Sequence, residues 1–344
     1  MAIHVEESLQ VILEKDLKPL VKRIDQDAFY PESVIQKLPG LVSGRPLNEE
    51  TRLIHEVSAT CMTTGFNLWC HFAALTYIRH TENLALKERF LHALESGSML
   101  GATGLSNPMK HYAGLETLHL HAIREKDGYT LSGALPAVSN LGPGHWFGVI
   151  AQTDDPAKRI MAFIPFDTEG LSTNEKLSYA GINGSATYSC KFSSVFVPDD
   201  DVISESADQF VKKIRPYFVT YQIPLGTGVT QAALASIGKY ETRQNRCNDF
   251  LSTDDQSLCH ELTLVQEKLD ILTSGGAPDW SEIVELKKQT TDLTASAVHT
   301  AMLHAGGSGY QSNSPDYRRL RESYFFLNLT PTVKHLEKLI NNNK

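Results

Sequence analysis

The apolar positions of the first hundred residues follow a helical repeat. An apolar series recurs at intervals of four, four, three and four residues, formed by Leu9, Leu13, Leu17, Leu20 and Ile24. This spacing places the five side chains on one face of an α-helix. Helical patterning continues over 69–79 and 84–94, and glycines follow at positions 97 and 101. We therefore predict a helical domain over residues 1–98.

The period of the pattern changes to two between residues 99 and 204. Leu118, Leu120 and Ala122 alternate with His119 and His121, which is typical of a strand with one buried face. Residues 126–128, Lys-Asp-Gly, form a turn signal before a second strand, so we expect a hairpin. Further strand-like runs lie at 147–152, 160–165 and 186–197. Several short strands in one region predict a small antiparallel β-barrel or sandwich.

Helical patterning returns after residue 204. One apolar stripe consists of Leu258, Leu262, Val265, Leu269 and Leu272, and glycines at 275 and 276 with a proline at 278 end it. Residues 229–240 and 280–303 are patterned in the same way, which predicts a C-terminal four-helix bundle over 205–344. The predicted fold class is α+β and multi-domain, with a middle β-domain over 99–204 between two helical domains.

Composition and charge exclude several classes of partner. The net charge is −8, and no block of basic residues indicates binding to nucleic acid or to an anionic membrane. The apolar stretches 65–74 and 146–151 are shorter than the ~20 residues of a membrane span, and residues 1–16 resemble no signal peptide. Five scattered cysteines without a Cys-x-x-Cys pair are expected to be free thiols. We expect a soluble cytoplasmic protein without a metal site.

Four segments carry recognisable motifs. Residues 101–108 read Gly-Ala-Thr-Gly-Leu-Ser-Asn-Pro, and residues 127–140 contain Asp-Gly-Tyr and, later, Pro-Ala-Val-Ser-Asn. Residues 169–198 contain Glu-Gly-Leu-Ser, Gly-Ser-Ala-Thr and Phe-Val-Pro, and residues 304–322 contain His-Ala-Gly-Gly-Ser-Gly-Tyr and Arg-Arg-Leu-Arg-Glu. In this order and on these predicted elements, the segments resemble the acyl-CoA dehydrogenase superfamily.

The resemblance implies an FAD-dependent oxidoreductase. In the family, the first motif lies along the flavin pyrimidine, and the position of Ser139 is close to the flavin N5. The aromatic residue that covers the flavin in the family is replaced by Ala137. The positions that the resemblance assigns to the cofactor are Ser106, Asn107, Ser139, Asn140, Arg243, Gly306, Gly307 and Thr332.

The glycine motif also implies a partner subunit. Adjacent glycines allow a backbone to approach a pyrophosphate closely, and in the family this loop reaches the FAD of a neighbouring subunit. A homodimer, usually built into a tetramer, is therefore expected. Leu303 stands where the family has a glutamine, and Arg246-Cys247 stands where it has Phe-Gly. A flavin reductase or an electron-transfer flavoprotein is the redox partner that the resemblance suggests.

The carboxylate that removes the substrate α-proton in the family is missing. Its usual position is Thr330, and its alternative position is Phe218. A Thr followed by Pro331 before an apolar-periodic segment predicts a helix N-cap with proline at the first helical position. Thr330 is also the candidate catalytic residue, because its hydroxyl could orient a substrate.

Other polar residues are weaker candidates. The candidates for acid–base chemistry are His71, His111, His145 and His304. The arginines Arg318, Arg319 and Arg321 are expected in a solvated turn or an inter-helix salt bridge, with an anionic ligand as the alternative.

Three functions remain open from the sequence. The first is an oxidoreductase that acts on an acyl thioester or a similar small molecule, bound to CoA, bound to a carrier protein or free. The second is a monooxygenase that uses reduced flavin. The third is a degenerate subunit without catalysis.

Overall fold

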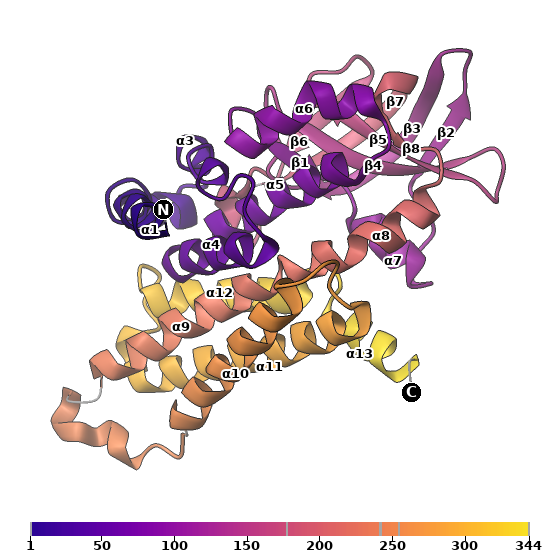
Figure 1. Cartoon of the computed structure of the whole chain (residues 1–344). Helices are drawn as coiled ribbons and strands as arrows, with labels where there is room; N and C mark the ends of the chain where they lie inside the picture. The colour runs from indigo at the N-terminus through magenta and orange to yellow at the C-terminus, as the bar shows by residue number, and fades with distance from the viewer. Residues whose placement is uncertain (1, 177, 241–242, 254, 343–344) are drawn as a thin grey trace.

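The computed structural model describes residues 2–176, 178–240, 243–253 and 255–342. A β-sheet stands at one end of the molecule, with helices from both halves of the chain packed below and beside it (Figure 1). The predicted α+β fold class, with strands between two helical regions, is confirmed.

The N-terminal region is helical, as predicted. Its elements are α1 (Ala2–Val11), the π-helix η1 (Ile12–Leu17), the 3-10 helix η2 (Lys18–Leu20), α2 (Val21–Gln26), α3 (Glu32–Ile35), η3 (Pro39–Leu41), α4 (Leu47–Thr60), α5 (Met62–His80) and α6 (Leu84–Ser96). The apolar face that begins at Leu9 is buried, but the single helix expected there is divided into α, π and 3-10 segments. Pro19 stands in the 3-10 segment and has no N–H for a regular helical bond.

The middle region forms one connected sheet. Its elements are β1 (Gly101–Thr103), α7 (Ser106–Tyr112), β2 (Leu120–Arg124), β3 (Gly128–Val138), β4 (Trp146–Thr153), β5 (Arg159–Pro165), β6 (Leu171–Glu175), η4 (Asn183–Ser185), β7 (Tyr188–Pro198), η5 (Asp199–Asp201) and β8 (Val202–Ser204). The strand order is β6-β7-β3-β2-β4-β5-β8, and β1 pairs with β4. The predicted hairpin is β2–β3, with Ala122 opposite Leu131. Contrary to the purely antiparallel expectation, β4 pairs in parallel with both β1 and β2.

The C-terminal region is a helical bundle with additional helices at its ends. Its elements are α8 (Ala207–Thr220), α9 (Ile223–Tyr240), η6 (Arg243–Phe250), α10 (Asp255–Thr273), α11 (Trp280–Ala305), η7 (Gly306–Ser308), α12 (Pro315–Asn328) and α13 (Val333–Asn342). The stripe predicted from Leu258 to Leu272 faces inward on α10, with Leu262, Val265 and Leu269 buried.

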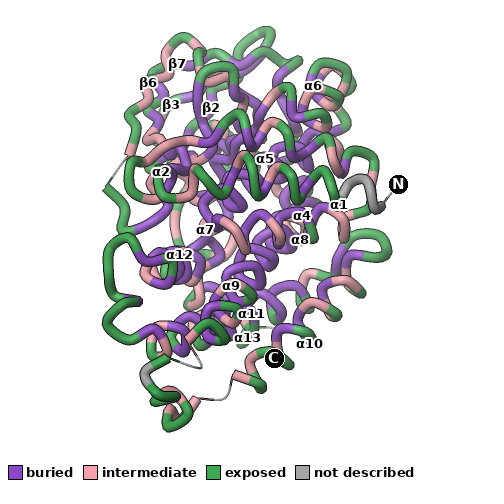
Figure 2. Tube along the Cα trace, turned by 90° about the vertical axis from the view of Figure 1, so that its left-hand side faces the viewer, coloured by how far each residue is buried: buried purple, intermediate pink, exposed green. Residues whose placement is uncertain are grey.

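Two hydrophobic cores stabilise the molecule. The larger core joins both helical regions, because α4 of the N-terminal region packs along α9 of the C-terminal region. Leu53 of α4 and Val229 of α9 both belong to this core. The smaller core lies within the sheet around Leu131 and Phe147. Figure 2 shows this burial concentrated along the central helices, while the outer turns are exposed. We propose the domain limits 1–98, 99–204 and 205–344, with the two helical domains sharing one core.

Three further observations concern the described part of the chain. No helix in it is long and apolar enough to cross a membrane. Within the same residues, no group of three or more His, Cys, Asp or Glu side chains is arranged to hold a metal ion. The five cysteines are free thiols, and Cys247 and Cys259 are the exposed ones.

Candidate functional site

A cavity of about 140 Å³ lies where the sheet meets both helical regions. The end of β3, the start of α7 and the end of α12 form its polar side, and α5 and α8 form its apolar side. The lining residues are Phe66, Trp69, Cys70, Thr103, Ser106, Ala137, Ser139, Phe218, Phe325, Asn328, Leu329 and Thr330. Segments more than two hundred residues apart in the chain therefore form one site.

Hydroxyl groups are paired around the cavity. The hydroxyls of Ser106 and Thr330 are 3.2 Å apart, and either can be the donor. Ser139 is paired in the same way with Thr187 at 2.7 Å. A hydroxyl can donate one hydrogen bond and accept others. Within each pair, one hydroxyl can therefore donate to the other, while the second hydroxyl keeps its hydrogen free to donate to a ligand. Ser106, Ser139 and Thr330, three residues singled out from the sequence, are thus brought together.

Thr330 is held by its backbone rather than acting as a helix cap. Its carbonyl accepts a hydrogen bond from Gln222 Nε2 at 2.9 Å, and the residue is 7% exposed. The last helix begins at Val333, and the carbonyl of Thr332 accepts the first bonds, from His335 and Leu336. The predicted N-cap at Thr330 is therefore wrong, because Pro331 lies before the helix and not in its first turn.

Aromatic rings close the inner end of the cavity. Phe66 stacks on Trp69 with ring centroids 5.3 Å apart, and its edge contact with Phe325 is at 4.8 Å. Trp69 meets Phe218 edge-on at 4.9 Å and donates from its indole N–H to the Phe218 carbonyl. Phe66 and Trp69 lie on α5, a helix that is buried on all sides. The sequence could not distinguish them from ordinary core residues.

No carboxylate is among the residues that line the cavity. Its titratable group is the Cys70 thiol, whose pKa burial raises well above the usual range. The buried carboxylates described elsewhere are engaged in the protein: Glu50 pairs with Arg79 at 2.7 Å, and Glu322 accepts from Thr63. The cavity lining therefore provides hydroxyl groups and apolar surface, but no carboxylate or imidazole that could act as a general base.

Two residues assigned to the cofactor serve the protein itself. Asn107 donates to Glu116 and to the Thr117 carbonyl, and accepts from the backbone N–H of His119. Asn140 is fully buried, donates to the Gly101 carbonyl and accepts from the hydroxyl of Tyr30. Because both amide groups are hydrogen-bonded inside the protein, contact of these two residues with a cofactor would be through the backbone, and their assignment to the cofactor stays a prediction.

The remaining cofactor positions lie away from the cavity. Arg243 is exposed and stacks over Tyr240 at 4.6 Å. Gly306 and Gly307 are exposed in η7, and a Cβ at either position would meet nothing within 4 Å. Thr332 is half-buried before α13 and does not line the cavity. Within one chain, these positions do not join Ser106 and Thr330.

The histidine candidates do not line the cavity. His71 accepts from the Gly101 N–H and lies 3.0 Å from the Leu94 carbonyl, and burial lowers its pKa to about 3. The ring nitrogens of His111, His145 and His304 are placed against the Glu116 carbonyl, the Asn140 carbonyl and the Thr253 hydroxyl. These contacts indicate structural roles for the four rings.

Arg318 and Arg319 are buried and Arg321 is partly buried, so the predicted solvated turn is wrong. Arg319 pairs with Asp316 within α12, while Arg321 bonds to Asp25 of α2 at 2.6 Å. Arg318 is 7% exposed and donates to the carbonyl at the end of α4. The expected inter-helix salt bridge is therefore found, and it ties α12 to the N-terminal helices.

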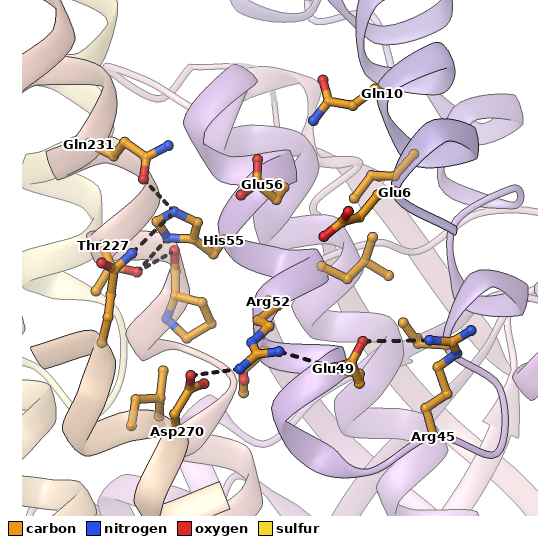
Figure 3. Close-up of a pocket in the computed structure, with 17 residues that line it drawn as sticks. Glu6, Gln10, Arg45, Glu49, Arg52, His55, Glu56, Thr227, Gln231 and Asp270 are labelled. Atoms are coloured by element: carbon orange, nitrogen blue, oxygen red, sulfur yellow. Dashed lines mark hydrogen bonds and ion pairs between the residues drawn. The ribbon is translucent and has the colours of Figure 1, made fainter. Parts of the chain in front are cut away.

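A larger cavity, of about 590 Å³, lies between α1, α4, α9 and α10 (Figure 3). Arg52 bridges Glu49 at 3.2 Å and Asp270 at 2.8 Å, and His55 contacts Gln231 at 2.9 Å. These polar groups are paired with one another, and none of the residues predicted from the motifs lines this cavity. We therefore place the candidate site at the smaller cavity, where the predicted hydroxyls converge.

Comparisons with known proteins agree with the sequence motifs. No family model matches the chain. It is 24% identical over 340 residues to the mitochondrial short-chain specific acyl-CoA dehydrogenase of Sus scrofa, covering 90% of this chain and 82% of that protein. Butyryl-CoA dehydrogenase from Megasphaera elsdenii superposes with a TM-score of 0.86 at 20% identity, covering 98% of this chain and 97% of that one.

A second solved structure is a glutaryl-CoA dehydrogenase from Mycobacterium smegmatis in complex with FADH2. Its TM-score is 0.83 at 16% identity, and it covers 99% of this chain and 93% of that one. The fold is thus that of these dehydrogenases. The resemblance to the acyl-CoA dehydrogenase superfamily is confirmed.

Proposed function

We propose that this relative of the acyl-CoA dehydrogenases binds FAD and catalyses a redox reaction on a small organic substrate in the 140 Å³ cavity. The proposal rests on one observation above all: Ser106 at the start of α7, Ser139 just after β3 and Thr330 in the loop between α12 and α13 converge there. The similar structure that contains FADH2 supports a flavin in this fold. When bound, FAD supplies the electron-transfer chemistry that amino-acid side chains lack.

The residues at the cavity fit one edge of a flavin ring, because a space of about 140 Å³ is smaller than the whole ring. A flavin ring is flat, with an apolar edge and a polar edge that carries hydrogen-bonding groups. The small Ala137 would leave room beside the ring. The hydroxyls of Ser106 and Ser139 could replace their present hydrogen bonds, to Thr330 and Thr187, with hydrogen bonds to the flavin. The fit is thus carried by shape and by neutral donors, with no charged group in the cavity wall.

The chain's own residues orient the substrate and exclude water. A base that removes a proton from carbon needs a pKa near the working pH, which a threonine hydroxyl does not have. We therefore assign the Ser106–Thr330 pair to hydrogen bonding with a polar group of the substrate. The aromatic side of the cavity keeps water from the reacting atoms. The substrate is an acyl thioester or a similar molecule, bound to CoA, bound to a carrier protein or free.

The absence of a carboxylate from the cavity lining favours a second function on the same fold. A monooxygenase that uses reduced flavin and O₂ needs no base for an α-proton. Its partner would be a flavin reductase, whereas a dehydrogenase would pass electrons to an electron-transfer flavoprotein. A subunit without catalysis is the third function, and it would retain the fold without turnover.

A second copy of the chain would complete the FAD site. Gly306, Gly307 and Arg243 are exposed and do not line the cavity, so they are open to a neighbouring subunit. In the family the glycine loop reaches the neighbouring subunit. We therefore propose a homodimer or homotetramer in the cytoplasm.

The test begins with the visible absorption spectrum of the purified protein, before and after addition of FAD. Flavin bands that bleach with an acyl-CoA would support the dehydrogenase. O₂ consumption that depends on substrate and on an added flavin reductase would support the monooxygenase. A colourless protein that takes up no FAD would overturn both and leave the non-catalytic subunit.

Two variants test the roles of individual residues. Thr330→Val keeps the side-chain shape and removes the hydroxyl, so turnover should fall while FAD content and folding stay normal; unchanged turnover would refute its orienting role. Gly307→Val should reduce FAD retention in the oligomer, because the branched side chain would stand where the pyrophosphate approaches. FAD retention equal to that of the wild type would refute this assignment.

A further inference from the structure

Another cavity, of about 560 Å³, lies between the N-terminal helices and the C-terminal bundle. Residues of α1, η1, η2 and α2 form one wall, and residues of α9 and the start of α12 form the other. The helix α4 lies between α1 and α9 and contributes the floor (Figure 1). We call this space the α2–α12 cavity. It shares no lining residue with the 140 Å³ cavity, so it is a separate place in the fold.

Hydrogen bonds bring α2, the end of α9 and the start of α12 together at one end of the α2–α12 cavity. The hydroxyl of Tyr240, the last residue of α9, donates to Asp316 of α12 at 2.9 Å. Gln26, at the end of α2, donates to the carbonyl of Ser312 at 3.2 Å, and Arg318 donates to the carbonyl at the end of α4 at 3.1 Å. Side chains from four helices therefore meet at this end.

This end of the cavity is positively charged. Lys22 lies one turn before the end of α2, and Lys239 lies in the last turn of α9. Both line the cavity, from opposite walls, and neither forms an ion pair with another described residue. The whole lining has five lysines and arginines but three carboxylates, in a chain whose net charge is −8. One of these carboxylates, Asp25, is already bonded to Arg321, which does not line the cavity.

Two buried arginines at the same end have unused hydrogen-bond donors. Arg318 and Arg319 line the cavity and are 7% and 8% exposed. Arg318 Nη1 and Arg319 Nε reach no acceptor among the described residues, and the Glu322 carboxylate, 3.6 Å from Arg318 Nη1, is too far for a hydrogen bond. Burial lowers the pKa of the Arg319 guanidinium. Charged donors that are buried without acceptors are unfavourable, and an anion would supply the missing acceptors.

The rest of the lining differs in character from the cationic end. Ala59 of α4 with Ala232 and Ala235 of α9 provide small, uncharged side chains. Gln10 and Glu56 line both this cavity and the 590 Å³ cavity, so they mark the end where the two cavities adjoin. Carboxylate and amide oxygens accept hydrogen bonds from hydroxyl or amino groups. The cavity is therefore cationic at one end and rich in acceptors at the other.

We propose that the α2–α12 cavity binds a phosphate monoester whose organic body carries hydroxyl or amino groups, as in a sugar phosphate or a nucleotide. The phosphate lies against Lys22, Lys239 and the two arginines, because phosphate pairs well with guanidinium and ammonium groups. The body lies along the alanines, with its polar groups at Glu56. The volume of about 560 Å³ falls within the range of about 300–1,000 Å³ that is usual for small-molecule sites.

Calorimetric titration of the purified full chain tests the proposal. The probes are ribose 5-phosphate and AMP, with ribose, adenosine and inorganic phosphate as their separate parts. FAD is present in excess throughout, so that AMP does not enter a flavin site. At least one ester should bind about tenfold more tightly than inorganic phosphate, and ribose and adenosine should not bind measurably. No binding of either ester overturns the proposal. Inorganic phosphate that binds as tightly as the esters, an adventitious ion only, also overturns it.

Lysine variants locate the phosphate. Lys22→Met and Lys239→Met should each weaken binding of the ester about tenfold, because each removes one charge from the cationic end. Both lysines are exposed, so the variants should fold, which thermal unfolding checks. Lys212→Met is the matched control, because Lys212 is exposed on α8 and lies outside the cavity lining. Unchanged affinity in both cavity variants, or an equal loss in the control, would contradict the placement.

A variant of Glu56 tests the opposite end. Glu56→Met removes a carboxylate that accepts hydrogen bonds, so it should weaken binding of the ester and leave binding of inorganic phosphate unchanged. Unchanged binding of the ester would show that its body does not reach Glu56. The proposal does not depend on the proposed function, since the two cavities share no residue. Failure of FAD to bind would leave it standing, and failure of the esters to bind would leave the proposed function standing.

Discussion

His71 should make the protein less stable on mild acidification. The ring is fully buried in α5 and joins two other elements. Its Nδ1 accepts the N–H of Gly101, where β1 begins, at 3.2 Å. Its Nε2 lies 3.0 Å from the Leu94 carbonyl, a distance at which the ring N–H donates. The neutral ring with hydrogen on Nε2 satisfies both contacts, whereas protonation would place a second N–H against that of Gly101.

The magnitude follows from the two pKa values of His71. Burial lowers the pKa in the folded state to about 3, while an unfolded histidine titrates near 6.5. Below about pH 6.5 the unfolded chain therefore binds a proton that the folded chain does not, so the free energy of unfolding falls as pH falls. Linkage gives a loss of about 2 kcal/mol between pH 7 and pH 5, which continues toward pH 3.

Paired unfolding curves isolate this residue. The free energy of unfolding is measured in urea at pH 5, 6, 7 and 8 for the wild type and for His71→Gln, which keeps a donor and an acceptor but does not titrate. The stability difference between the two proteins should shift by about 2 kcal/mol in favour of the variant from pH 7 to pH 5. His299→Gln, at an exposed position of α11, is the control. A difference that is independent of pH would refute the reasoning.

Two other predictions use matched pairs of variants and thermal or urea unfolding. In α9, Gly226→Ala would place a Cβ in steric conflict with the buried ring of Phe326, so we expect a loss of about 1–3 kcal/mol from overpacking. Gly238→Ala in the same helix meets nothing within 4 Å and should stabilise the protein by up to about 1 kcal/mol; losses of equal size in both variants would contradict the packing argument. Glu50→Gln should cost about 1–3 kcal/mol, because Arg79 loses its buried carboxylate partner and keeps the partly exposed Glu95. Glu14→Gln, in an exposed pair, should cost less than about 1 kcal/mol, and a small loss at both positions would show that burial does not strengthen the ion pair.

The backbone around Thr330 is held by hydrogen bonds although its side chain carries no charge. The resemblance predicts that Thr330 stands where the family has a carboxylate; the Thr330 carbonyl accepts a hydrogen bond from Gln222, and its hydroxyl is paired with that of Ser106. Substitution at this position therefore removes a charge without leaving an empty space. The chemistry we propose relies on orientation by hydroxyls in an apolar setting.

Local features of the sequence could be predicted because they depend on neighbours along the chain. The Leu258–Leu272 stripe and the Lys-Asp-Gly turn at 126–128 needed only the helical repeat and a hairpin turn, and both elements form. Motif order also predicted the resemblance to the acyl-CoA dehydrogenase superfamily and the α+β fold class. The residues Ser106, Ser139 and Thr330 were singled out in the same way, as positions within motifs.

The sequence predictions were wrong where contacts with distant parts of the chain overrode a preference of neighbouring residues. The series from Leu9 to Ile24 has a helical spacing, but the observed π and 3-10 turns adjust the face so that Leu13, Leu17 and Ile24 are buried. Thr330 has the sequence of an N-cap, but its carbonyl is taken by Gln222, which is 108 residues away. In both places, packing against distant elements outweighed a local preference that contributes on the order of 1 kcal/mol.

The sequence by itself thus determined the elements, their order and the motif positions, because these follow from periodicity and turn chemistry over a few residues. Only the tertiary structure decided that Ser106 lies against Thr330 across 224 residues, and that Asn107 and Asn140 turn inward. It also decided that Phe66 and Phe218 face a cavity, whereas most apolar residues of their helices face a core. The physical reason is that apolar burial has no direction of its own, so an aromatic side chain becomes part of a site only when close packing leaves a space beside it.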